Sequence, residues 1–174
     1  MELMETILNR RSVRKYSGEK IEEEIIKKIL QAGLAAPSGR SRRPWEFILV
    51  RDKETLSKMS VSRKCGAGML AQADCAIVVI ADPKKTDVWT EDCSIAMAYM
   101  HLMADRLGVG SCWIQGRLRN APDDRTMEEH LRELLGYPKE YCLEAILSLG
   151  MTEEHPIARK IEDLPEEKVH YDRF

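Results

Sequence analysis

The sequence lacks the signatures of several protein classes. No uninterrupted apolar run approaches the ~20 residues of a membrane span, and the first residues, which include Glu2 and Glu5, form no secretory signal. The five cysteines are odd in number and scattered without a C-x-x-C pair, so neither a disulfide framework nor a zinc site is indicated. We therefore expect a cytoplasmic protein, without a membrane partner, whose cysteines are reduced and mostly buried.

Common catalytic motifs are missing as well. There is no P-loop, no H-E-x-x-H and no metal-ligand spacing among the four histidines. His101 lies in an apolar segment and is predicted to be a core histidine rather than a proton donor. A net charge of -2 and an aromatic content of 6% argue against a nucleic-acid-binding module, despite the local run of Arg40, Arg42 and Arg43. That run is read either as a solvated loop or as an attraction for an acidic substrate.

The residues that are present predict one globular domain. Charged residues make up 32% of the chain and hydrophobic residues 44%, and 174 residues suit a single domain spanning 1–174. Apolar periodicity predicts helices over 3–8, 21–30, 91–107 and 126–135, the last with a T-x-x-E capping box at Thr126 and Glu129. Strands are predicted at 47–50, 76–81 and 145–149; the first two read as buried, and 76–81 as covered on both faces.

The most informative segment is residues 10–16, with the sequence RRSVRKY. It places four cations and a hydroxyl at the end of a short amphipathic helix. If the chain is extended here, Arg10, Ser12 and Arg14 point the same way, and guanidinium groups grip phosphate oxygens through paired hydrogen bonds. The alternative is a solvated basic turn.

Three further segments carry a resemblance to a known family. Residues 36–47 read APSGRSRRPWEF, residues 107–116 read LGVGSCWIQG, and the pair Arg159 and Lys160 follows near the C-terminus. With the RRSVRKY segment, in this order, these motifs make the chain resemble the nitroreductase family of FMN-dependent oxidoreductases. The resemblance runs from residue 10 to residue 160.

The resemblance implies an α+β fold, with a mixed central β-sheet flanked by helices on both sides, in an intertwined homodimer. It also implies FMN as cofactor, NAD(P)H as transient electron donor and a small organic electron acceptor such as a nitroaromatic or a quinone. Residues 152–174 would be a C-terminal extension that packs on the partner subunit, which accounts for a tail with little periodicity.

The same resemblance assigns cofactor-binding positions, while the flavin itself carries the chemistry and no side chain is assigned as catalytic. Arg10, Arg11, Ser12 and either Arg159 or Lys160 would hold the phosphate, and Arg14 would approach the pyrimidine edge of the ring. The ring would meet backbone N–H groups of a loop after a strand, formed by Trp113, Ile114, Gln115 and Gly116. The second subunit would contribute Pro37, Ser38, Gly39 and Ser41.

Some positions depart from the family, and some alternatives stay open. Relatives often carry Asn and Gln where this chain has Ser41 and Arg43, and polar ring contacts where it has Gly66 and Met69. Trp113 could instead be a core residue that caps its strand. Rival functions are a reductive dehalogenase of iodotyrosine type, a flavin-fragmenting enzyme of the same fold, and a non-catalytic flavin-binding redox sensor.

Overall fold

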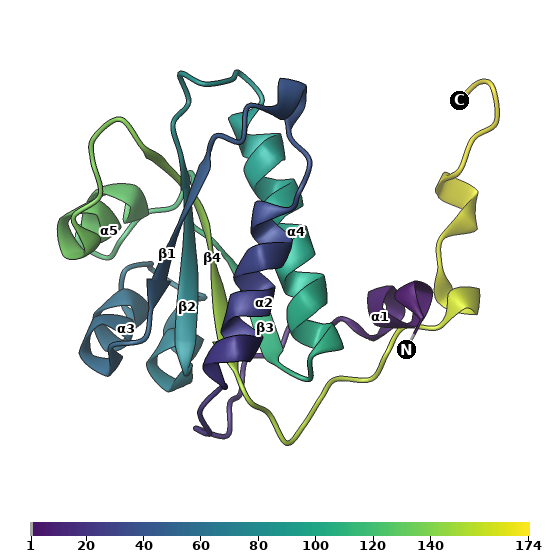
Figure 1. Ribbon diagram of the computed structural model, residues 1–174, viewed down its shortest axis with the longest axis horizontal. Helices are drawn as coiled ribbons and strands as arrows, with labels where there is room; N and C mark the ends of the chain where they lie inside the picture. The colour runs from purple at the N-terminus through teal and green to yellow at the C-terminus, as the bar shows by residue number, and fades with distance from the viewer. Residues whose placement is uncertain (1) are drawn as a thin grey trace.

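The computed structural model describes residues 2–174, and its elements are arranged around one sheet (Figure 1). The helices are α1 (Leu3–Asn9), α2 (Glu23–Leu34), α3 (Lys53–Ser60), α4 (Trp89–Arg106) and α5 (Met127–Leu135). The strands are β1 (Trp45–Val50), β2 (Cys75–Ala81), β3 (Gly110–Gln115) and β4 (Cys142–Gly150). Short 3₁₀ turns lie at Gly39–Ser41, Gly68–Gln72, Ile161–Asp163 and Glu166–Lys168. Every predicted helix and strand is present, with boundaries shifted by a few residues.

The sheet has the strand order β1-β2-β4-β3, and each neighbouring pair is antiparallel. Within residues 2–174 the one parallel pairing is an isolated bridge between Ser12 and Ser111. The α+β class is confirmed, and the mixed character expected of the sheet is confined to this bridge. The bridge matters because it attaches the segment that follows α1 to the outer edge of β3.

Burial along the strands follows their position in the sheet. All seven residues of β2 are buried, as predicted for a strand covered on both faces. The strand predicted at 47–50 is present, but it is only partly buried: Val50 is buried, whereas Leu49 is exposed. β1 pairs only with β2 and lies at the edge of the sheet, so Glu46 and Leu49 are exposed.

Helices cover both faces of the sheet (Figure 1). On one face Ile77 packs with Ile29 of α2 and Met97 of α4, in a buried apolar cluster. On the other face Val78 packs with residues of α3 and α5, including Leu131. Adjacent residues of one strand thus enter opposite cores, as the alternation of side chains along a strand requires.

Helix α4 is buried on its sheet side and apolar on its outer side. Three polar residues lie on its buried face: Asp92, His101 and Asp105. On the outer face Ile95 and Tyr99 are 38% and 42% exposed. An exposed apolar helix face of this kind is typical of a surface that another molecule covers.

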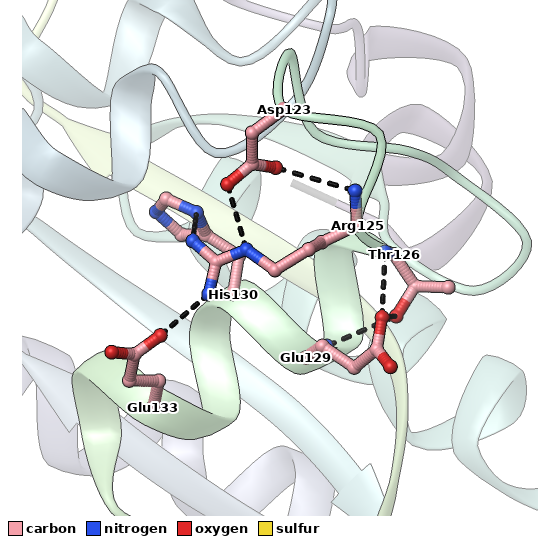
Figure 2. A network of polar contacts seen from close by, with 6 residues as sticks. All are labelled: Asp123, Arg125, Thr126, Glu129, His130 and Glu133. Carbon is pink, nitrogen blue, oxygen red and sulfur yellow. Dashed lines mark hydrogen bonds and ion pairs between the residues drawn. The ribbon is translucent and has the colours of Figure 1, made fainter.

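Helix α5 begins at the predicted capping box (Figure 2). The Thr126 hydroxyl accepts a hydrogen bond from the Glu129 N–H at 3.1 Å, and the Glu129 carboxylate accepts one from the Thr126 N–H at 2.8 Å. Arg125 joins the same network through ion pairs with Asp123 and Glu133. Gly136 ends the helix in the left-handed conformation, with φ at 71°.

We expect Thr126→Ala to lower the free energy of unfolding by about 1 kcal/mol, because it removes the acceptor for the Glu129 N–H. Urea unfolding followed by circular dichroism measures this. Ser57→Ala, at an exposed position inside α3, is the control and should change the value by less than ~0.5 kcal/mol. Equal effects of the two substitutions would show that the cap contributes nothing.

Two segments lie away from the sheet. Figure 1 shows α1 and the C-terminal segment, residues 152–174, extending beyond α4. Apolar side chains along this segment are exposed, including Ile157 at 85% and Tyr171 at 85%. In residues 2–174 no helix combines the length and the apolar character that crossing a bilayer requires.

Candidate functional site

The basic segment, residues 10–16, runs along the outer edge of β3. Besides the bridge between Ser12 and Ser111, the Val13 N–H donates to the Ser111 carbonyl at 2.9 Å. Val13 is 3% exposed and anchors the segment in the core. The Tyr16 hydroxyl donates to the Val13 carbonyl at 3.0 Å and lies 2.7 Å from the Ser148 hydroxyl. The segment is therefore extended and fixed to the sheet.

Three side chains of this segment gather near the thiol of Cys112. Burial raises the pKa of Cys112, while Arg14, a hydrogen bond with Ser12 and the charge of Arg10 lower it. That Arg10, Ser12 and Arg14 point the same way stays a prediction.

The C-terminal segment returns to this cluster. The Arg159 N–H donates to the carbonyl of Leu8 in α1 at 2.9 Å, and a guanidinium nitrogen of Arg11 donates to the Ile157 carbonyl. Burial lowers the pKa of Arg10, and the like charge of Arg159 lowers it further. Arg10 and Arg159 are therefore close neighbours, although 149 positions separate them in the sequence.

Lys160 has a different environment from Arg159. Both residues are exposed, but the Lys160 ammonium lies 3.8 Å from the Glu162 carboxylate, whereas no carboxylate is paired with Arg159 among the described residues. Of the two predicted phosphate contacts near the C-terminus, Arg159 is the one beside Arg10. In residues 2–174 no carboxylate oxygen lies within 4.0 Å of the guanidinium groups of Arg10, Arg11, Arg14 or Arg159. These four residues, with Ser12, are called the cationic cluster below.

A buried histidine of α4 contacts the cationic cluster through Arg10. His101 Nε2 lies 2.9 Å from Arg10 Nη1, and His101 Nδ1 lies 2.6 Å from the Ser111 hydroxyl. One turn along α4, Asp105 accepts hydrogen bonds from Asn9 at 2.9 Å and from His155 at 3.0 Å. The sequence analysis placed His101 in the core correctly but missed Arg10 as its partner, because no local pattern links residues so distant in the chain.

The predicted ring-binding loop differs from its expected form. Trp113, Ile114 and Gln115 belong to β3 itself, and only Gly116 follows the strand. Ile114 is 1% exposed, in the core on the α3 and α5 side, whereas the Trp113 Nε1–H donates to the Gln115 side chain at 2.9 Å. The error arose because continuous strand pairing with β4 extends to Gln115, which local sequence does not encode.

Gly116 occupies a tight position between two strands. A Cβ atom there would lie 2.5 Å from Leu143 Cδ2, so only glycine fits without movement. The backbone N–H groups of Gly116 and Arg117 both donate to the Glu144 carbonyl, at 3.1 and 2.9 Å. This use removes the Gly116 N–H from the donors predicted to meet a ring.

Glu144 is a residue that the sequence analysis missed. The pairing of β2 with β4 shifts register so that Val79 faces Ala145 and Ile80 faces Leu143, which leaves Glu144 as the extra residue of a β-bulge. Its side chain is 3% exposed, and Oε2 has no hydrogen-bond partner among the described residues. Burial raises the pKa of this carboxyl, while a hydrogen bond with the Gln115 side chain lowers it. The sequence did contain a signal for this residue, because Glu144 is the one acidic residue in an otherwise mostly apolar strand.

The predicted segment with Pro37, Ser38, Gly39 and Ser41 lies near Asp92, at the N-terminal end of α4. The Gly39 N–H donates to the Asp92 carboxylate at 2.7 Å, and the Ser38 hydroxyl accepts from the Arg43 N–H at 2.9 Å. Asp92 precedes His101 by nine positions in α4, which is about 14 Å along a helix axis. Within one chain, Pro37, Ser38, Gly39 and Ser41 are therefore separated from the cationic cluster. This turn is also strained, with positive φ at Arg40, Ser41 and Arg43.

The fold and the cationic cluster together define an α+β protein with positive charge gathered at the outer edge of its sheet. The family model described as "Nitroreductase family" matches residues 7–63 and 56–151. The chain belongs to the nitroreductase family, as the sequence motifs indicated.

Relatives of known name agree with this assignment. A protein from Archaeoglobus fulgidus, named as a candidate NADH dehydrogenase/NAD(P)H nitroreductase, is 39% identical over 99% of both chains. The solved structure of an FMN-dependent nitroreductase from Clostridium difficile is 45% identical, with a TM-score of 0.95 over 98% of this chain and 99% of that chain. Mouse iodotyrosine deiodinase 1 is 38% identical, but only over 33% of this chain and 20% of its own length.

Proposed function

We propose that this protein is an FMN-dependent oxidoreductase. It takes reducing equivalents from NAD(P)H and passes them to an oxidised organic acceptor, such as a nitroaromatic or a quinone. The cationic cluster is the observation that carries the proposal, because it sits in a nitroreductase-family chain and no carboxylate oxygen of the described residues lies within 4.0 Å of its guanidinium groups. Relatives with whole-chain coverage carry names of the same activity.

The cluster fits the charge of the flavin phosphate. A phosphate monoester carries ~1.5–2 negative charges near neutral pH, and Arg10 and Arg159 repel each other until an anion lies between them. Arg10, Arg11, Ser12 and Arg159 hold the phosphate in this proposal. Arg14, exposed on the same side of the segment, supplies positive charge beside the pyrimidine edge of the ring.

The ring-side contacts come from elsewhere in the chain. The proposal keeps Trp113, Ile114, Gln115 and Gly116 near the ring through the backbone at the end of β3. The Ile114 side chain is in the core and the Gly116 N–H is bonded to Glu144, so Trp113 and Gln115 supply the side chains there. When bound, FMN supplies a group that accepts hydride and passes on electrons. The protein positions that group, and Glu144 beneath Gln115 is a buried carboxyl that can hold a proton.

A homodimer completes this site in the proposal. The turn at Pro37, Ser38, Gly39 and Ser41 lies far from the cationic cluster of its own chain, so it serves the cluster of the partner subunit. The outer face of α4 adjoins an apolar groove of ~600 Å³ lined by α1, α2 and α4. Residues 1–174 then act as one domain whose extension, residues 152–174, packs on the partner.

The purified protein is expected to be yellow, to bleach anaerobically with NAD(P)H and to regain colour with a quinone. Since donor and acceptor use one flavin face in turn, steady-state kinetics should be ping-pong, with parallel double-reciprocal lines. Intersecting lines would contradict a shared face. Yellow protein that NAD(P)H does not bleach would favour the redox sensor, and turnover of iodotyrosine but not of quinones would favour the dehalogenase.

A further inference from the structure

His101 is a buried residue with two well-defined polar partners. It is 7% exposed within α4, and its two ring nitrogens contact Arg10 from the basic segment and Ser111 from β3. Ser111 is itself 2% exposed and is held to the basic segment by the bridge to Ser12. The imidazole therefore connects three elements directly beneath the cationic cluster.

The chemistry of the partners fixes the state of the ring. A guanidinium has only donors, so Nε2 of His101 must accept the hydrogen bond from Arg10 Nη1. The ring proton then lies on Nδ1 and is donated to the Ser111 hydroxyl. Burial and the charge of Arg10 lower the pKa of His101 to about 4, while Asp105 raises it. The ring is neutral at physiological pH.

We infer that neutral His101 is the positioning residue of Arg10, and that it aims the guanidinium of Arg10 at the anion shared with Arg159. The inference rests on the proposed function. A neutral acceptor orients an arginine without cancelling its charge, whereas a carboxylate in the same place would compete with the phosphate. Asp105, the nearest carboxylate on α4, is instead occupied by Asn9 and His155.

The charged groups around His101 favour this assignment. Arg10 reaches the ring from the basic segment, and Arg159 from the C-terminal segment contributes a second positive charge near Arg10. Asp105 on the same helix is the only acid among the groups that shift the pKa of His101. A proton on Nε2 would remove the acceptor and add a third cation to this group. The contact is therefore lost below the folded-state pKa of about 4 and intact above it.

Two isosteric variants separate positioning from packing. In His101→Gln the amide oxygen reaches the place of Nε2 and keeps an acceptor for Arg10. In His101→Asn the shorter amide reaches only the place of Nδ1, so the contact to Ser111 is kept and the one to Arg10 is lost. We expect His101→Asn to weaken FMN affinity roughly tenfold and His101→Gln to weaken it less than about threefold, by flavin fluorescence titration.

A double-mutant cycle tests the route of the effect. In an Arg10→Ala background, His101→Asn should cause no further loss, because the residue that it positions is gone. An undiminished loss in that background, or equal losses in His101→Asn and His101→Gln, would overturn the inference. Sedimentation of each variant checks that its assembly state is unchanged.

Long-range ¹⁵N NMR of His101 gives a readout that needs no flavin. The apo-protein should show a protonated Nδ1 and an unprotonated Nε2 from about pH 5.5 to 8, with no titration in that range. A proton on Nε2, or titration near the ordinary histidine value, would overturn the inference. Wild-type protein that binds no FMN would refute the proposed function, and the NMR spectrum would still decide the contact between His101 and Arg10.

Discussion

A chain truncated after His155 should lose both stable dimerisation and flavin. Residues 156–174 carry exposed apolar side chains, among them Ile157 and Phe174, and they include Arg159 of the cationic cluster. Stable obligate dimers bury well over the ~1,600 Å² of an ordinary interface. In our proposal, α1 and α4 bury that much area only together with the C-terminal segment of the partner subunit. Because His155 is retained, its hydrogen bond with Asp105 is kept, and the loss is assigned to the removed segment.

Sedimentation velocity at micromolar concentration measures the assembly state, and absorbance measures the retained flavin. The matched control is Arg159→Ala in the full-length chain, which removes one phosphate contact and leaves the apolar side chains in place. It should weaken FMN binding but remain dimeric. A truncated chain that sediments as an FMN-loaded dimer would contradict the role proposed for the C-terminal segment.

Local signals predicted the elements whose causes are local. The capping box of α5, with Gly136 at its end, lies within eleven residues, so one stretch of sequence specifies both boundaries. The β-branched run of β2 likewise predicts a strand buried on both faces. These features need no knowledge of the rest of the chain.

Features that depend on distant partners were missed or misplaced. Leu49 reads as a core residue, yet β1 pairs on one side only, so this apolar side chain is exposed. The β-bulge at Glu144 exists because two strands pair out of register, and His101 gains its role from a residue 91 positions away. Spacing within one segment cannot report such contacts.

The candidate site shows the same division. The resemblance predicted that Arg10 and either Arg159 or Lys160 serve one site, and the Arg159 backbone lies beside Leu8 at the end of the helix that precedes Arg10. Motif order alone left Lys160 as an equal alternative, and only the path of the C-terminal segment past Leu8 favours Arg159. The turn at Ser38 and Gly39 lies at the far end of α4, so its place in a site depends on a second chain.

Replacing Arg10 with alanine should weaken FMN binding by roughly one to two orders of magnitude, because hydrogen bonds to a charged group contribute about 1.5–3 kcal/mol. The side chain is half-buried and already oriented by His101, and no carboxylate oxygen of the described residues lies within 4.0 Å of its guanidinium. Little reorganisation is therefore needed when the anion binds. Flavin fluorescence titration gives the affinity.

Two comparisons make this expectation specific to the phosphate. Lys15→Ala removes a positive charge from an exposed neighbour in the same segment, and it should change affinity much less than Arg10→Ala does. Riboflavin has the same ring but no phosphate, so its weaker binding should be equal in wild-type protein and in Arg10→Ala. Equal losses of FMN affinity in the two variants would show that Arg10 acts only through its positive charge and makes no specific contact with the phosphate. A matching loss for riboflavin would place Arg10 at the ring instead of the phosphate.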